Sequence, residues 1–167
     1  MRSAVIYYSY SGNTKKVAQI LGEYLKEKGE VSVIELQGLD ESNNFFIQGK
    51  RAFKHERAKV QPLNFDLSGY DLICLGTPLW LFGPAPAINT YLDQCLGVDG
   101  KDVIIYVTYG SGAGKGRCLN YMQSILAEKG AKTFKRFFIQ QRKVADSKFV
   151  LSKIKEIWPL SFDHDSG

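Results

Sequence analysis

The sequence predicts an α/β protein with a doubly wound, five-stranded parallel sheet between two layers of helices. Two observations support this fold class. Short apolar runs alternate along the chain with segments whose apolar residues recur at the helical period of 3.6 residues. The chain has 167 residues, which suits one domain with a core of its own. Regular alternation of this kind places parallel strands in one layer and helices on both faces of the sheet.

The first half of the chain begins with a clear strand–helix unit. Residues 4–8 are apolar and predict a buried strand. Beyond a turn at 9–14, one helix face carries Val17, Ile20, Leu21, Tyr24 and Leu25. Gly29 is expected to end this helix. Apolar and polar residues partly alternate over 31–36, which predicts a second strand at a sheet edge. The stretch 37–66 is less regular, with a short helix expected around 44–57.

The second half contains three further units with clearer signals. Strands are expected at 71–76, 103–107 and 134–139. The helix after the first of these begins at Pro84, because proline is tolerated in a first turn. The next helix ends at Gly130 and the last one at Pro159. Their apolar faces comprise Ile88, Tyr91, Leu92, Cys95 and Leu96, then Cys118, Met122, Ile125 and Leu126, then Val150, Ile154, Ile157 and Trp158. Residues 1–160 are expected to form a single domain, followed by a polar tail at 161–167.

Composition excludes several classes of function. No apolar run approaches the roughly 20 residues of a membrane span, and the N-terminus enters a strand pattern rather than a signal peptide. Three cysteines without paired spacing indicate reduced thiols in a cytoplasmic protein. The sequence contains no Cys/His cluster that would indicate a metal site. The formal net charge is +5, partly concentrated in Lys50, Arg51, Lys54, Arg57 and Lys59. No nucleic-acid motif accompanies this charge, so we interpret most of it as a solvated face.

The most informative segment is the turn between the first strand and the first helix. It contains Ser9, Ser11, Gly12, Asn13 and Thr14. A helix start aims unpaired N–H groups and a positive dipole end at an anion, and hydroxyls add donors. The alternative is a simple helix cap by Ser11 or Asn13, but a cap needs only one such residue. The turn contains no lysine or arginine, which favours a phosphate monoester over a nucleoside triphosphate.

Two later loops are expected beside this turn, because ligands of such sheets bind at the carboxyl ends of the strands. The loop after the third strand holds Thr77, Pro78, Leu79, Trp80, Phe82 and Gly83. Its aromatic residues either form an apolar wall for a flat ring or pack onto the core. The loop after the fourth strand holds Thr108, Tyr109, Gly110, Ser111 and Gly112. It matches neither a phosphate-binding P-loop nor a dinucleotide fingerprint, and it suits the edge of a planar ligand. Flavin mononucleotide (FMN) has the shape that these three loops would accept.

The chain resembles the flavodoxin family over nearly its whole length. The resemblance rests on residues 9–14, Tyr70-Asp71-Leu72-Ile73, residues 76–80, Pro84-Ala85-Pro86-Ala87 and residues 108–112. It implies a strand order of 2-1-3-4-5 with FMN at the junction of strands 1 and 3. It also implies that Ser9, Ser11, Gly12, Asn13 and Thr14 hold the phosphate. Thr77, Pro78, Leu79 and Trp80 would line the ribityl chain and ring, and Tyr109, Gly110 and Gly112 the far side of the ring.

The chain departs from typical flavodoxins in two respects that bear on its partner. It is basic where those carriers are strongly acidic, and its 37–66 segment is longer than a minimal connection. It is more similar to small stand-alone flavodoxin-like proteins. Both departures bear on the partner of the protein, and neither changes the expectation that the chain binds FMN.

The resemblance implies electron transport through non-covalently bound FMN, with no catalytic side chain because the flavin carries the chemistry. A peptide at Gly83 or beside it would hydrogen-bond the ring nitrogen that gains a proton on reduction. The expected partner is a redox protein, acidic in charge, or a small electron acceptor. One alternative is an FMN-dependent NAD(P)H oxidoreductase acting on a quinone or a similar acceptor. Another is a non-redox binding module on the same fold.

Overall fold

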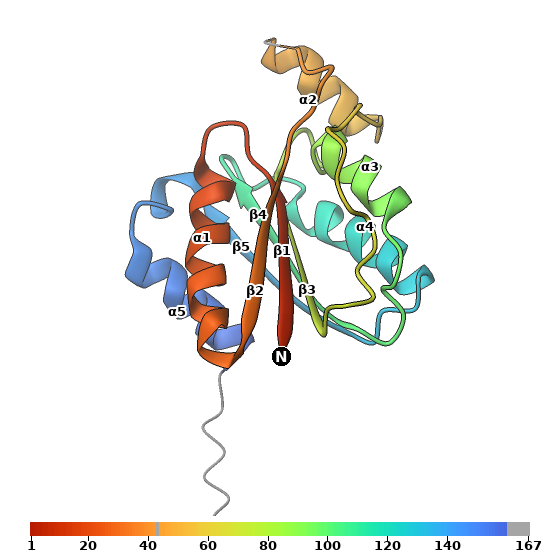
Figure 1. Ribbon diagram of the computed structural model, residues 1–167. Coiled ribbons are helices and arrows are strands. Elements are labelled where there is room, and N and C mark those ends of the chain that lie inside the picture. Colours follow the sequence, from red (N-terminus) through yellow and green to blue (C-terminus); the bar gives the residue numbers. More distant parts are fainter. Residues whose placement is uncertain (43, 160–167) are drawn as a thin grey trace, which may run out of the picture.

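The computed structural model describes residues 1–42 and 44–159, and the predicted tail at 161–167 lies outside them. Strands and helices alternate along this part of the chain as expected (Figure 1). Two short 3₁₀ turns, Lys26–Lys28 and Gln141–Lys143, follow α1 and β5. The elements are β1 (Arg2–Tyr8), α1 (Asn13–Leu25), β2 (Glu30–Leu36), α2 (Phe45–Phe53), β3 (Leu72–Pro78), α3 (Pro86–Gln94), β4 (Asp102–Tyr109), α4 (Lys115–Glu128), β5 (Thr133–Gln140) and α5 (Ser147–Ile157).

The five strands form one parallel sheet in the order β2-β1-β3-β4-β5, which confirms the predicted topology. Both neighbours of β1 are parallel to it: Val5 pairs with Val33 of β2 and with Cys74 of β3. The central strands β1, β3 and β4 are almost entirely buried, whereas most residues of β2 and β5 are exposed or half-buried. This difference follows from position, since only central strands are covered on both faces and lack a free edge.

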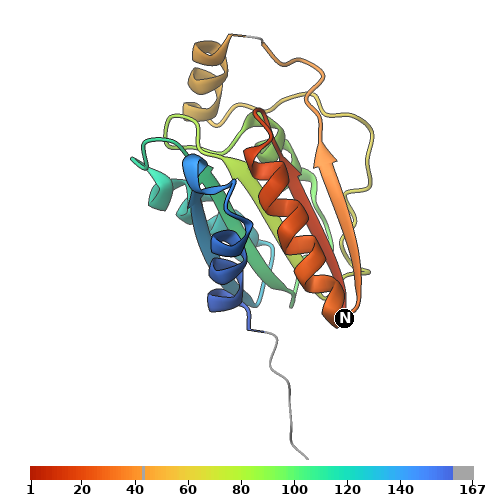
Figure 2. The same cartoon turned by 90° about the vertical axis from the view of Figure 1, so that its left-hand side faces the viewer.

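Two apolar cores lie on opposite faces of the sheet. Alternate residues of β1 point to opposite sides, so Ile6 packs in one core and Val5 in the other. Helices α3 and α4 cover the first core, and α1 and α5 cover the second, as Figures 1 and 2 show. The apolar helix faces expected from the sequence supply these contacts, with one exception. Leu96, expected on the face of the helix after β3, lies beyond the end of α3 and is exposed, so that prediction is wrong. No helix of the described residues is long and apolar enough to cross a membrane.

The segment between β2 and β3 places α2 above the carboxyl ends of the strands (Figure 1). The helix ends at Phe53, earlier than the 44–57 span expected from the sequence. The chain then leaves helical geometry at His55, whose φ is 52°. Further along, the buried Thr90 of α3 holds the backbone at Ala58. The Thr90 hydroxyl donates to the Ala58 carbonyl (2.7 Å) and accepts from the Ala58 N–H (3.0 Å). Tertiary contacts therefore end α2, and the local pattern could not show them.

Candidate functional site

The three loops that the sequence singled out meet at the carboxyl edge of the sheet. The buried hydroxyls of Thr14 and Thr108 lie 2.8 Å apart and join the start of α1 to the end of β4. The Leu79 N–H donates to the Thr108 carbonyl (2.8 Å), which joins the loop after β3 to the same strand. Thr108 therefore lies at the centre of the assembly. Contacts between residues up to 94 positions apart in the chain therefore join the three loops.

The first loop leaves the beginning of α1 open to an anion. Gly12 occupies the N-cap with a φ of 86°, and no side chain caps the helix there. The Ser11 hydroxyl instead accepts from the Asn13 amide (3.0 Å), and the Ser9 hydroxyl accepts from the Lys15 N–H (3.2 Å). No hydrogen bond within the described residues uses the N–H groups of Asn13 and Thr14. A cap by Ser11 or Asn13 is therefore absent, and the donors that bind a phosphate remain available.

Gly12 also keeps the approach to this helix clear. A side chain at Gly12 would meet nothing within 4 Å, so open space lies above the turn. The positive φ is a conformation that glycine adopts without strain. The first turn of α1 contains no acidic residue that would repel an anion.

A strained two-residue turn forms the tip of the loop after β3. Leu81 and Phe82 have φ values of 41° and 72°, which side chains other than glycine rarely adopt. Trp80 and Gly83 exchange both backbone hydrogen bonds across the turn, each 3.0 Å long. These features define a turn of the I′ class, which normally contains Asn and Gly. Strained backbone of this kind clusters at functional sites.

The surroundings hold this turn in place. The Thr77 hydroxyl accepts from the Ala85 N–H (2.9 Å) and donates to the Pro78 carbonyl (3.0 Å), which ties the two ends of the loop together. Gly83 lies so close to α2 that a side chain there would come within 2.5 Å of the Ala52 carbonyl oxygen. The N–H groups of Leu81 and Phe82 make no hydrogen bond within the described residues. They are two rigidly held donors with no partner.

A cavity of about 120 Å³ lies between this turn and the loop after β4. Its wall contains four predicted site residues, Leu79, Phe82, Gly110 and Ser111. Leu81 and Ala113 also line it, although the sequence pattern did not single them out. Leu81 could have been found only from its backbone conformation, and Ala113 only from its place in the glycine-rich loop. The lining is uncharged and combines apolar side chains with polar backbone and hydroxyl atoms, which suits a flat heteroaromatic ring with polar atoms at its edge.

The two large predicted ring contacts, Trp80 and Tyr109, do not line this cavity. Trp80 is 4 % exposed and makes edge-to-face contacts with Tyr8 and Tyr10, each with ring centroids 5.5 Å apart. Tyr109 makes an edge contact with Phe138 at 5.8 Å, and the Lys115 ammonium lies over both rings. Trp80 therefore packs against Tyr8 and Tyr10 and supports the turn, and Tyr109 lies at the β5 side of the site.

One titratable group lies directly against the turn. His55 stacks on Tyr121 with ring centroids 3.9 Å apart, and its ring lies within 3.5 Å of the position a Gly83 side chain would take. Burial, and then the positive charges of Arg117 and Arg57, lower the pKa of His55 below its ordinary value. Its Nδ1 atom is buried without a hydrogen-bond partner. The imidazole is therefore neutral at pH 7.

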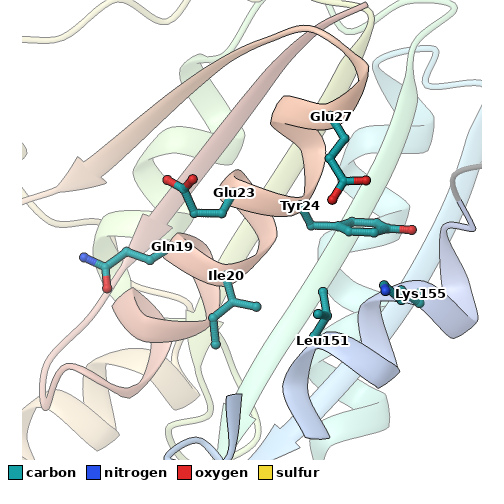
Figure 3. Close-up of a pocket in the computed structure, with 7 residues that line it drawn as sticks. All are labelled: Gln19, Ile20, Glu23, Tyr24, Glu27, Leu151 and Lys155. Atoms are coloured by element: carbon teal, nitrogen blue, oxygen red, sulfur yellow. The ribbon is translucent and has the colours of Figure 1, made fainter. Parts of the chain in front are cut away.

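A larger pocket lies elsewhere, in a groove of about 330 Å³ between α1 and α5 (Figure 3). Ile20 and Leu151 form its apolar part, with Glu23, Glu27 and Lys155 around it. None of the predicted site residues lines this groove. The described residues contain no group of three His, Cys, Asp or Glu side chains that could hold a metal ion.

Comparisons with solved structures show the same fold in several flavoproteins. A flavoprotein from Lactobacillus acidophilus NCFM, crystallised in complex with FMN, is 22% identical with a TM-score of 0.67, covering 88% of this chain and 98% of that one. Oxidised flavodoxin 1 from Bacillus cereus is 18% identical with a TM-score of 0.61, covering 93% and 98%. An NADH:FMN oxidoreductase in its apo form is 17% identical with a TM-score of 0.63, covering 94% and 88%. No curated protein matches the chain.

A family model described as NADPH-dependent FMN reductase matches residues 1–144. This span contains β1 through β5, and with them all three loops of the candidate site. The chain belongs to the NADPH-dependent FMN reductase family, a group with a flavodoxin-like fold.

Proposed function

We propose that the protein is an FMN-dependent oxidoreductase that takes electrons from NAD(P)H and passes them to an acceptor. FMN is the cofactor of the family to which the chain belongs. One observation carries the proposal for this chain. The N–H donors of Leu81 and Phe82, which have no partner within the described residues, border an uncharged cavity at the sheet edge that also carries the uncapped start of α1.

The residues present fit FMN at both ends. The N–H groups of Asn13 and Thr14, with the Ser11 hydroxyl beside them, would hold the phosphate. The cavity is smaller than the 300–1,000 Å³ of a complete small-molecule site, so it would take only part of the ring system. The N–H groups of Leu81 and Phe82 would donate to polar atoms at the ring edge.

Bound FMN supplies the redox chemistry, and the protein supplies position and environment. No side chain lining the cavity ionises near neutral pH, so the lining excludes water and orients the ring without exchanging protons. The hydrogen bonds and packing that hold the strained turn fix the two donors before ligand arrives, and preorganised donors stabilise developing charge most effectively.

A second candidate function is that of an electron carrier that docks a partner protein. Large apolar side chains are exposed around the site, among them Phe46 (85 % exposed), Leu81 (54 %) and Phe53 (49 %). Exposed apolar residues gathered beside a functional site are typical of an interaction surface. A carrier of this kind would receive its electrons from the partner rather than from a nicotinamide nucleotide.

Oxidation of NADH and NADPH by the FMN-loaded protein, with ferricyanide or a quinone as acceptor, tests the two functions. The oxidoreductase predicts FMN-dependent turnover with at least one nucleotide, and no turnover after FMN removal. Failure to oxidise either nucleotide, with a protein that still binds FMN, would contradict the oxidoreductase and leave the carrier.

The phosphate assignment is tested by comparing FMN with riboflavin, which lacks the phosphate. Ser11→Ala is expected to weaken FMN binding about 5- to 10-fold, because one hydroxyl donor to a charged phosphate is lost. Riboflavin binding should not change. Ser152→Ala on α5 removes an exposed hydroxyl that contacts only the helix backbone, and it serves as the control. Equal losses for FMN and riboflavin would contradict the assignment.

A further inference from the structure

The outer side of α2 is exposed to solvent. Figures 1 and 2 show this helix at one end of the molecule, beyond the carboxyl ends of the strands. Its buried residues, Gln48, Gly49 and Ala52, lie toward the domain, where Gly49 is next to the Leu81 side chain. The exposed residues recur at the spacing of one helical stripe, which we call the α2 face: Phe46, Ile47, Lys50, Phe53 and Lys54.

The α2 face combines large apolar side chains with positive charges. Phe46 is 85 % exposed, and Ile47 and Phe53 are each 49 % exposed. Apolar residues gathered in this way on a surface mark a site of interaction. Lys50 and Lys54 lie among them, and neither forms an ion pair within the described residues. One partner could therefore gain apolar burial and charge neutralisation at the same time.

The charge of the face is not neutralised by carboxylates of its own. The α2 face contains no Asp or Glu. Two carboxylates beside the helix are already bound to Arg51, since its guanidinium pairs with Asp40 (3.0 Å) and Glu56 (3.4 Å). A surface with this excess of cations favours an anionic partner.

The α2 face lies close to the candidate site. Leu81 and Phe82 line the cavity and are themselves exposed. Leu81 also packs on α2, because a side chain added at Gly49 would come within 3.1 Å of it. A partner that covers the α2 face would thus lie beside the opening of the cavity.

The chemistry of the face separates the possible partners. A second copy related by a two-fold axis would bring the face against itself, so Lys50 and Lys54 would meet like charges without a carboxylate to pair with them. A protein partner would need pockets shaped for protruding side chains such as Phe46. An anionic lipid surface needs no pocket, because its fluid interior accepts apolar side chains while lysine ammonium groups reach the phosphates.

We propose that the α2 face docks the protein on an anionic lipid surface. Phe46, Ile47 and Phe53 enter the boundary between headgroups and acyl chains, and the two lysines bind headgroup phosphates. The contact is peripheral and reversible, because it depends on one face of a nine-residue helix. This inference goes beyond the proposed function, since lipid binding requires neither FMN nor a nicotinamide nucleotide.

Cosedimentation of the FMN-loaded full chain with lipid vesicles gives the first test. The vesicles contain phosphatidylcholine alone, or phosphatidylcholine with about one-third phosphatidylglycerol as the anionic lipid. We expect the partition coefficient on anionic vesicles to be at least about 10-fold higher than on neutral vesicles. It should fall as the salt concentration rises from about 0.1 M to about 0.5 M, because salt screens the lysine charges.

Two sets of variants test the residues of the face. The double variant Lys50→Gln, Lys54→Gln should lower the partition coefficient on anionic vesicles about 10- to 30-fold, because each lysine near the surface contributes a factor of about 5. Its control, Lys132→Gln with Lys135→Gln, removes the same charge from exposed positions at the amino end of β5 and should change the value less than about 2-fold.

Phe46→Ser should lower the partition coefficient about 10-fold, because a large apolar side chain no longer enters the lipid. Leu96→Ser, at an exposed residue beyond the end of α3, is the matched control and should have little effect. Thermal unfolding of each variant checks that the surface change leaves the fold intact.

The outcomes separate this inference from its alternatives and from the proposed function. No binding to anionic vesicles, equal binding to neutral ones, or equal losses in the variants and their controls would overturn it. Lipid-free dimerisation that Phe46→Ser abolishes would also overturn it, because the face would then belong to a second copy. A protein that binds anionic vesicles through α2 but oxidises neither nucleotide would contradict the oxidoreductase and support the lipid contact.

Discussion

At the scale of single residues, the site depends on backbone conformations that its side chains do not favour. Leu81, Phe82 and His55 all have positive φ values, and they are the only residues other than glycine in the described chain that do so. Each such position costs about 1–2 kcal/mol of conformational energy. All three lie where α2 meets the turn after β3. Packing in this region therefore compensates for the strain, and the same packing holds the N–H donors of the turn in place.

His55 makes stability in this region dependent on pH. Its pKa is lowered in the folded protein by burial first, and then by Arg117 and Arg57. Below the ordinary pKa of about 6.5, the unfolded chain takes up a proton that the folded protein refuses, so the free energy of unfolding falls as the pH falls. His55→Asn tolerates the positive φ and removes the titration. We expect its free energy of unfolding to decrease less than that of the wild type between pH 7.5 and 5.5.

Urea unfolding of both proteins at the two pH values measures this difference. The second histidine, His164, is common to both proteins and cancels in the comparison. An identical decrease in the two proteins would show that His55 is not the group responsible.

At the scale of elements, the position of α2 depends on the absence of a side chain at Gly83. Gly83→Ala would place a methyl group 2.5 Å from the Ala52 carbonyl oxygen, so α2 or the turn must shift. We expect a loss of about 1–3 kcal/mol in the free energy of unfolding, as is typical of overpacking. FMN binding should weaken as well, because the turn moves.

Gly116→Ala is the matched control for this change. Gly116 lies within α4, where a side chain would meet nothing within 4 Å. Replacing a helical glycine by alanine in open space should leave stability unchanged or raise it by up to about 1 kcal/mol. Urea unfolding and FMN titration check both variants. Equal stability of Gly83→Ala and wild type would show that the contact with α2 is not tight in solution.

At the scale of the whole molecule, ligand binding and stability are linked through the joined loops. Thr14, Thr108 and Leu79 connect three strand ends, so a ligand that contacts all three loops binds only the folded chain. FMN at 100 times its Kd should add about 2.7 kcal/mol to the free energy of unfolding. For a domain of this size the melting temperature should then rise by about 5–10 °C.

Thermal unfolding with and without FMN measures this effect, with free phosphate and riboflavin as partial ligands. Each partial ligand should give a smaller shift than FMN at equal concentration, because it occupies only one part of the site. A shift with riboflavin equal to that with FMN would contradict a role for the start of α1.

The parallel sheet and the three loops could be predicted from the amino-acid pattern, and the strand order from the resemblance to flavodoxins. The reason is that buried parallel strands and amphipathic helices leave local signals, and strand ends in such a sheet must share one edge. Ser9–Thr14, Thr77–Gly83 and Thr108–Gly112 all lie where the pattern placed them. The polar character of the first loop and the glycine-rich character of the last could be predicted as well, because each depends only on residues that are neighbours in the chain.

Which side chains line the cavity, and which basic residues form ion pairs, depends on tertiary contacts and could not be predicted from local pattern. Trp80 is buried between Tyr8 and Tyr10, whereas Leu81 reaches the cavity through a strained turn that long-range packing imposes. Arg57 is paired with Asp93, a carboxylate 36 positions away, whereas the guanidinium of Arg117 lies 5.9 Å from the centre of the Phe53 ring. Such outcomes depend on contacts between distant segments, and no local periodicity records them.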